Sequence, residues 1–314
     1  MKAIGLMSFG GPDVLQEIDL PEPVPGHNEV RIKVAAAAIS PTDTLLRAGQ
    51  HKDRLHHLRP PYVPGMDAAG EIDAIGTGVL GWQVGDQVMA IVSPHRQLGG
   101  AYAQQLVVPA DSVARIPAGV TLAEAATLPM NALTARATLD ALALPPGAVL
   151  GVTGAAGAYG GYLIALASHE GLQVIADAAP ADEKLVASFG AQEIVARGDG
   201  VAERFRAAHP GGVDAVADGA LLFEQAVPAI RDGGQLAIVR GWNGTPGRGI
   251  KVRWIRVHRY VREAAKLDQL RELAESGVLE LRVAGTYPAA QAAEAHRQLE
   301  RGGVRGRIVL LFSS

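Results

Sequence analysis

The stretch 149–177 constrains the fold of this chain more than any other part of the sequence. A short apolar strand, 149–153, leads into a glycine-rich turn, a helix of small residues and a second apolar strand, 173–176, followed by Asp177. Strand, turn, helix and strand in this order, with an acid about 20 residues after the turn, are typical of one half of a dinucleotide-binding βαβ unit.

The residues of the turn, Gly154-Ala155-Ala156-Gly157-Ala158-Tyr159-Gly160, fit a diphosphate. Gly157 lets the backbone approach a pyrophosphate, Gly160 lets helix and strand pack closely, and the helix N-terminus offers N–H groups and a positive dipole. Such a pattern also occurs in purely structural turns, and here Ala155 replaces its first glycine. The flanking strand and helix favour the dinucleotide interpretation. The predicted contacts are Ala155, Gly157, Ala158, Tyr159 and Gly160.

The composition agrees with an α/β protein of two domains. At 314 residues, with 48% hydrophobic and 19% charged residues, the chain is long enough for two cores. The net charge of −3 shows no basic excess, so nucleic acid is not an expected partner. The chain has no cysteine, no apolar run near 18 residues and no signal-peptide pattern at its start. We therefore expect a cytoplasmic protein with no membrane partner.

The chain divides into two regions with different predicted secondary structure. Residues 1–122 contain short strands separated by Gly and Pro, at 30–34, 69–75, 87–92 and 104–108. Helices at 122–128 and 132–142 follow, and after the βαβ unit come a helix at 182–189 and strands at 193–195, 214–217 and 235–239. This alternation predicts a doubly wound parallel sheet of five or six strands within 123–261. Residues 262–314, with a helix at 289–300 and a strand at 307–312, are expected to return to the first domain.

Six motifs carry a resemblance to a known family. They are Ser40-Pro41-Thr42-Asp43 with Arg47, Pro64-Gly65-Met66-Asp67-Ala68-Ala69-Gly70, Gly85-Asp86-Gln87-Val88, Leu133-Thr134-Ala135, the turn at 154–160, and Gly306-Arg307-Ile308-Val309-Leu310. Together they resemble the zinc-free quinone oxidoreductase (zeta-crystallin-like) group of the medium-chain dehydrogenase/reductases. The resemblance implies a GroES-like β-rich catalytic domain, 1–122 completed by 262–314, and a Rossmann NAD(P)-binding domain, 123–261, with the active site in the cleft between them.

The resemblance also addresses the metal and the reaction. Zinc-dependent members carry a Cys at the position of Ser40 and a His at that of Met66. A hydroxyl and a thioether do not replace a thiolate and an imidazole on Zn²⁺, so we expect no metal. What the family then implies is hydride delivery from NAD(P)H to an acceptor that is already electrophilic, a quinone first, or alternatively an activated C=C such as an enone, enal or biosynthetic intermediate.

Three residues are candidates for catalysis. Ser40 stands where similar enzymes have an Asn, and its single O–H is a candidate to polarise a carbonyl. Asp43 is interpreted either as part of the nicotinamide pocket or as a loop-capping carboxylate paired with Arg47. Tyr62 is interpreted either as a proton donor or as a packing residue beside Pro60-Pro61.

The choice of cofactor depends on the end of the second strand. Asp177 stands where an acid accepts from the 2′-hydroxyl of NAD and repels the 2′-phosphate of NADP, unless a shift of one residue in register turns it to the other face. Similar enzymes mostly use NADPH, and Lys184 and Arg307 are candidate phosphate partners. We expect NADP(H), with NAD(H) open. The resemblance adds Thr134, Gly219, Arg240, Gly241 and Trp242 as contacts, Trp242 being equally interpretable as core and Thr134 also as an ordinary helix residue.

An alternative function, the histidine-rich loop 50–59 and the oligomeric state are interpreted as follows. A non-catalytic NADPH-binding sensor or structural protein is the alternative from another class. His51, His56 and His57 lie in the loop 50–59, which is interpreted as solvated or as a substrate contact, because adjacent histidines rarely bind one metal without further ligands. By analogy with similar proteins we expect a homodimer formed through the sheet edge 250–255.

Overall fold

The computed structural model describes residues 1–313. The chain divides into two compact units, the first made of Met1–Met130, His258–Glu275 and the chain from Leu281 onward, the second of Asn131–Val257 and Ser276–Glu280. The sequence placed the first boundary at 122, but helix α3 (Leu122–Ala125) belongs to the first unit, where it packs on strands β3 and β4. Within residues 1–313, no helix has the length and apolar character needed to cross a membrane.

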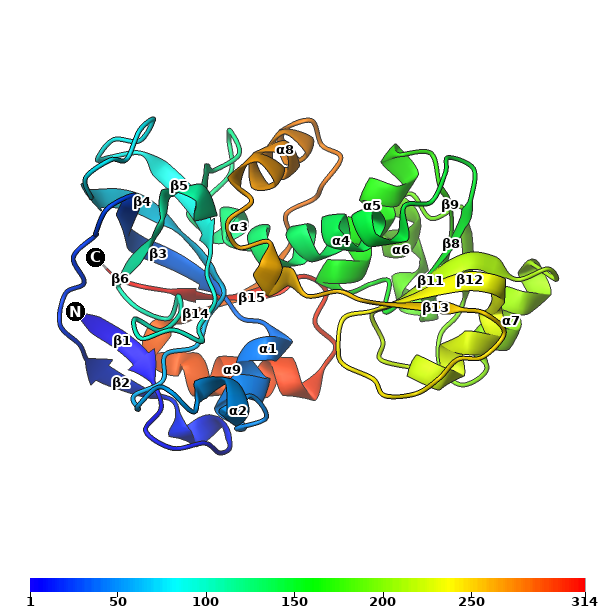
Figure 1. The fold of residues 1–314 in the computed structure, drawn as a ribbon, viewed down its shortest axis with the longest axis horizontal. Coiled ribbons are helices and arrows are strands. Elements are labelled where there is room, and N and C mark those ends of the chain that lie inside the picture. The colour runs from blue at the N-terminus through cyan, green and yellow to red at the C-terminus, as the bar shows by residue number, and fades with distance from the viewer. Residues whose placement is uncertain (314) are drawn as a thin grey trace. The chain divides into compact units, whose positions relative to one another are not determined.

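The first unit is built on a seven-stranded sheet (Figure 1). Its order is β14 (Val283–Pro288), β15 (Arg307–Leu311), β3 (Glu29–Ala38), β4 (Asp67–Ile75), β5 (Gln87–Ile91) and β7 (Val113–Arg115), with β6 (Gln105–Pro109) paired to β3. Val30, Ile32 and Val34 alternate along β3 and are buried, as a half-buried strand requires. Because β15 pairs antiparallel with β3, the C-terminal segment completes the sheet of this unit.

Short strands and helices surround that sheet. Strands β1 (Lys2–Gly5) and β2 (Gln16–Asp19) form an antiparallel pair, and the helices are α1 (Pro41–Arg47), α2 (Lys52–Leu55), α3, α8 (Ala264–Glu275) and α9 (Ala292–Arg301). Helix α9 buries Ala292, Ala295 and His296 on one face. Helix α8, which we did not predict, buries Leu267 and Leu270.

The second unit contains a six-stranded parallel sheet, which confirms the predicted α/β fold (Figure 1). The strand order is β10 (Glu193–Ala196), β9 (Gln173–Ala178), β8 (Val149–Thr153), β11 (Val213–Asp218), β12 (Ile230–Ile238) and β13 (Lys251–Trp254). The helices are α4 (Pro129–Leu142), α5 (Ala158–His169), α6 (Glu183–Ser188) and α7 (Val201–Ala208). The chain winds outward in both directions from β8 and β11, so their carboxyl ends form the switch point at which such sheets bind ligands.

Candidate active site

Asp43 ties two loops of the first unit together. Ser40 precedes helix α1, and its N–H donates to Asp43 Oδ2 at 2.8 Å. The N–H of Gly65 donates to Asp43 Oδ1 at 3.0 Å. Both Ser40 and Asp43 are fully buried. Asp43 thus caps this loop through the backbone N–H groups of Ser40 and Gly65 rather than through a direct pair with Arg47.

Arg47 reaches Asp43 through a chain of hydrogen bonds. Tyr102 Oη donates to Asp43 Oδ2 at 3.2 Å and lies 3.1 Å from His296 Nε2, while Arg47 Nη1 lies 3.3 Å from His296 Nδ1. A guanidinium only donates, so Nδ1 accepts and the imidazole hydrogen is on Nε2. Every donor in the chain thus points toward Asp43. At its other end Arg47 pairs with the partly exposed Glu300, with Nη2 2.5 Å from Oε1.

The pKa shifts of Asp43, Tyr102 and His296 agree with the directions of the hydrogen bonds that link them. Burial raises the pKa of Asp43 to about 6, against the opposing effect of the N–H groups of Ser40 and Gly65. Burial, with the neighbouring Arg47 charge, lowers the pKa of His296 to about 3. Burial also raises the pKa of Tyr102. At neutral pH the chain therefore holds a carboxylate, a phenol and an uncharged imidazole.

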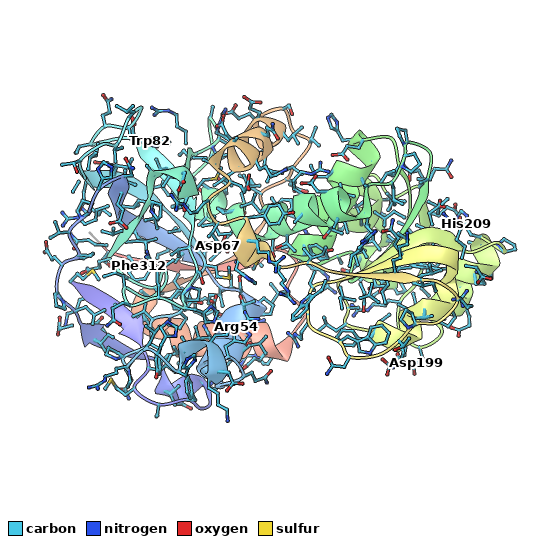
Figure 2. All side chains as sticks on the ribbon, viewed as in Figure 1. Arg54, Asp67, Trp82, Asp199, His209 and Phe312 are labelled. Atoms are coloured by element: carbon cyan, nitrogen blue, oxygen red, sulfur yellow. The ribbon has the colours of Figure 1, made fainter. Side chains whose placement is uncertain are left out.

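Arg307 belongs to a second buried pair in the same unit, with Asp67, which is labelled in Figure 2. Its Nη2 donates to Asp67 Oδ2 at 2.7 Å and to Ser40 Oγ at 2.8 Å. Arg307 is 3% exposed and Asp67 is completely buried. The prediction that Arg307 binds a 2′-phosphate was wrong, because its charge is buried and already paired. Asp67 has a structural role here, as the buried partner of Arg307.

The other two candidates for catalysis are held by contacts within the first unit. Ser40 Oγ accepts from Arg307, and its O–H has no acceptor among residues 1–313, but the residue has no exposed area. Ser40 is thus a member of the buried network. Tyr62 stacks on Phe9, with ring centroids 5.3 Å apart, and its hydroxyl lies 3.4 Å from the carbonyl oxygen of Leu58. This placement favours the packing interpretation of Tyr62.

The glycine turn of the second unit has the geometry that a diphosphate needs. Gly154 has φ +70°, and a Cβ on Gly160 would lie 2.5 Å from Gly154 O and 2.7 Å from Ala155 Cα. Gly157 is the N-cap of α5 and, as a glycine, contributes no side-chain capping hydrogen bond. Gly157, Ala158 and Tyr159 are partly exposed. The turn therefore leads into a partly exposed helix N-terminus, which suits a pyrophosphate.

Asp177 faces this turn rather than the solvent beyond β9. Its Oδ1 accepts from the N–H of Ala155 at 3.0 Å, and the residue is only 5% exposed. Burial raises the pKa of its carboxyl group. Asp177 thus stabilises the glycine turn, and the expected contact of an exposed acid with a ribose hydroxyl does not fit its position.

Two exposed cations follow strands β9 and β10 along the chain. Lys184 is on α6, and its ammonium group forms no hydrogen bond or ion pair with residues 1–313. Arg197 follows β10, and its N–H donates to Ala178 O at 2.9 Å. Its guanidinium is likewise unpaired within the described chain, and its charge lowers the pKa of Asp177. Arg197 was not predicted, because only the parallel pairing of β10 with β9 brings it to this strand end.

Thr134 and Tyr159 are linked on one side of the second unit. The hydroxyl of Thr138 donates to the carbonyl oxygen of Thr134 at 2.8 Å and lies 2.9 Å from Tyr159 Oη. Helix α4 is thus fixed to the first turn of α5. Gly219 is in close contact with the end of β8 at the switch point, since a Cβ there would lie 2.7 Å from Thr153 O.

The predicted contacts after β12 are less closely tied to the turn. Arg240 and Gly241 are exposed, whereas Trp242 is partly buried and stacks on Phe223, with ring centroids 6.1 Å apart. Trp242 also packs against the hydrophobic core of the unit. This placement favours its interpretation as a packing residue.

The positions of the zinc ligands in related enzymes hold a different contact here. Thr42 Oγ1 lies 3.5 Å from Met66 Sδ, while Ser40 is engaged by Arg307. Within the described part of the chain, no three His, Cys, Asp or Glu side chains are grouped so that they could hold a metal ion.

Comparison with known proteins agrees with both units. Residues 26–118 match the alcohol dehydrogenase GroES-like domain and residues 189–310 the zinc-binding dehydrogenase family. Quinone oxidoreductase of Sus scrofa is 26% identical over 334 residues, which cover 99% of this chain and 98% of that protein. The chloroplastic NADPH-dependent alkenal/one oxidoreductase of Arabidopsis thaliana is 31% identical, over 99% of this chain and 79% of that protein. A solved mycobacterial protein complexed with NADPH has a TM-score of 0.88 at 30% identity, covering 99% of this chain and 100% of that one.

A GroES-like β unit and a Rossmann unit with an open glycine turn define a nicotinamide-dependent oxidoreductase. The chain belongs to the medium-chain dehydrogenase/reductase superfamily, in its quinone oxidoreductase group, and is an NAD(P)H-dependent reductase.

Proposed function

We propose that this protein reduces quinones with NADPH and without a metal. The observation that carries the proposal is the glycine turn, with the partly exposed Gly157 as N-cap of α5 and the close approach at Gly160. The turn would hold the cofactor's pyrophosphate, and the bound nicotinamide would supply the hydride. The solved relative complexed with NADPH supports the same cofactor.

The preference for NADPH over NADH rests on Lys184 and Arg197. Both side chains are exposed and unpaired among residues 1–313. Arg197 is bonded to the end of β9, Lys184 is on the next helix along the chain, and Asp177 is turned toward the glycine turn. A 2′-phosphate would gain charge-assisted hydrogen bonds there. We expect Arg197→Gln and Lys184→Gln each to raise KM for NADPH about tenfold, because tenfold corresponds to the free energy of one such bond. Neither variant should change kcat or the KM for NADH.

Lys33→Gln is the matched control for those two variants, because Lys33 is an exposed cation on β3 of the first unit. An equal rise of KM for NADPH in all three variants would reduce the effect to net charge. A rise for NADH as large as that for NADPH would remove the assignment of these two residues to the 2′-phosphate.

A quinone is favoured as acceptor because the buried network offers no exposed acid. Ser40 and Asp43 are fully buried, so neither is available to protonate a substrate at the surface. A quinone needs no such acid for hydride transfer, since the hydroquinone oxygen that forms takes its proton from water. The rival acceptor is an activated C=C, which the Arabidopsis alkenal/one oxidoreductase supports by similarity. Product analysis separates them, because a quinone gives a hydroquinone and an enone gives a saturated carbonyl.

A protein that binds NADPH without turnover is the alternative from another class, and the same burial of Ser40 and Asp43 favours it. Such a protein would bind NADPH and oxidise none of it with any acceptor. Calorimetric binding of NADPH together with product analysis for both acceptors decides between reductase and sensor.

We further propose that two copies pair through β13. This strand is at the edge of the six-stranded sheet and exposes Val252 by 36% and Trp254 by 43%, with the Arg256 guanidinium 3.7 Å above the Trp254 ring. An unprotected apolar edge favours strand pairing between chains. Sedimentation should show a dimer that Val252→Lys dissociates. A monomeric wild type would contradict this pairing.

A further inference from the structure

A group of basic side chains in the first unit lies outside the Asp43 network. The rings of His95 and His51 are 5.3 Å apart between centroids, with their planes at 57°. The charges that act most strongly on His95 come from His51, Arg54, His258 and His57, all of which are positive when charged. We call these five residues the His95 cluster.

The fold holds both parts of this cluster in place. Helix α2 carries Arg54 (labelled in Figure 2), has His51 as its N-cap, and is anchored by Leu55, which is buried. The His95 loop, 93–99, follows β5 and precedes Tyr102. Its position is fixed at both ends.

Both ends of the His95 loop are bonded to the segment that carries Asp67. On the near side the N–H of Val92 donates to Met66 O at 2.9 Å, and on the far side the N–H of Tyr102 donates to Pro64 O at 3.0 Å. The loop that carries His95 is therefore connected at both ends to residues next to the buried network around Asp43.

His95 has one ring nitrogen without a partner. Nδ1 lies 3.3 Å from Ser93 Oγ, whereas Nε2 is buried and has no hydrogen-bond partner. Burial and the cationic neighbours lower the pKa of His95 to about 4. A buried polar atom without a partner costs free energy, and an oxyanion placed in the cluster would both accept from His95 and offset its cationic surroundings.

Arg54 supplies the permanent charge of this site. It is exposed, and its guanidinium makes no hydrogen bond or ion pair with residues 1–313. Asp53 precedes it on α2, but is not among the charges that act most strongly on His95. A metal ion does not suit the cluster, because Arg54 repels cations and the described residues contain no metal-binding group of His, Cys, Asp or Glu.

We propose that the His95 cluster binds an oxyanion, a carboxylate or phosphate, carried by the acceptor substrate. This inference rests on the proposed reductase function and narrows its substrate to an electrophile with an anionic group. Hydrogen bonds to a charged group are stronger than neutral ones, so the site would contribute to selection between otherwise equal acceptors.

A matched pair of quinones tests this directly, because a quinone is the proposed acceptor. Wild-type protein with NADPH should reduce (1,4-benzoquinone-2-yl)acetic acid with a higher kcat/KM than its methyl ester. Arg54→Gln and His95→Gln should each lower kcat/KM for the acid about tenfold and leave the ester unchanged. Lys33→Gln, which removes an exposed cation on β3, should change neither substrate. Equal kcat/KM for acid and ester, or equal losses for both in the variants, would overturn the proposal.

A binding measurement keeps the test independent of turnover. With ¹⁵N-histidine-labelled protein, the His95 signal should shift saturably on titration with acetate or with inorganic phosphate, and the stronger of the two would identify the oxyanion. Arg54→Gln should weaken that binding. If no acceptor consumes NADPH, the reductase proposal fails while a saturable shift still supports the site. Absence of a saturable shift with both ions overturns the site, whether or not the two quinones are reduced.

Discussion

Arg307 and Asp67 form an ion pair inside the first unit, with Nη2 2.7 Å from Oδ2 and exposures of 3% and 0%. Removing one partner of a buried pair leaves an uncompensated charge and costs about 3–5 kcal/mol. Arg307→Met should therefore lower the thermal unfolding midpoint strongly, and Arg307→Met with Asp67→Leu should restore much of the loss.

Arg231→Met is the control for this experiment, because it removes the exposed pair with Asp214 and should cost about 0–1 kcal/mol. Similar midpoints for Arg307→Met and Arg231→Met would show that the buried pair does not stabilise the unit.

Asp43 should make stability fall as pH rises. Its pKa is about 6 in the folded protein against an ordinary value of 3.8, so between these values the folded state binds more protons than the unfolded state. The free energy of unfolding therefore decreases with pH over that range and is constant above it. Urea unfolding of wild type and Asp43→Asn from about pH 4 to pH 7 measures this, and the stability of wild type relative to the variant should fall as pH rises. A difference that is constant with pH would mean that Asp43 has no raised pKa.

His296 should remain uncharged, with its hydrogen on Nε2. Its pKa is lowered to about 3, and Arg47 occupies Nδ1 as a donor. The ¹⁵N signals of this ring should show the Nε2–H tautomer and should not titrate between about pH 5 and pH 8, in contrast to an ordinary exposed histidine. His27, which is exposed, is the internal comparison. A mid-range titration of His296, or the opposite tautomer, would disprove the direction assigned to the Arg47–Asp43 chain.

Gly160→Ala should disrupt the second unit more than Gly157→Ala. The added Cβ would lie 2.5 Å from Gly154 O at position 160, but 3.2 Å from the same atom at position 157. We expect the first variant to be destabilised and to lose NADPH binding, and the second to fold normally but bind NADPH more weakly, because its methyl group occupies the phosphate approach. Thermal unfolding and calorimetric binding measure both effects. Equal stability of the two variants would mean that helix and strand are not in close contact at Gly160.

The sequence predicted what is local. The turn at 154–160 and the strands around it follow from residue spacing, so a parallel sheet of five or six strands was predicted, and it has six. Helix α8 was missed, although Leu267 and Leu270 lie one turn apart on its buried face. Its bounds carry no strong capping signal, and the charged residues between them hid the periodicity.

The buried network was not predictable because its members are far apart in sequence. Asp43, Tyr102 and His296 meet only once β15 has paired with β3 and α9 has packed on the first unit. The same reason explains the error at Arg307, since a charged residue near the C-terminus gave no sign of being buried against Asp67. Asp177 differs, because the sequence left its side-chain direction open and the register of β9 decided it.

We propose that this protein reduces an electrophilic acceptor with NADPH. The most direct test is the anaerobic loss of nicotinamide absorbance with NADPH and, in parallel, with NADH, using a small quinone as acceptor. We expect rapid loss of absorbance with NADPH, slower loss with NADH and formation of the hydroquinone. Unchanged absorbance with both cofactors, in a protein that demonstrably binds NADPH, would contradict it.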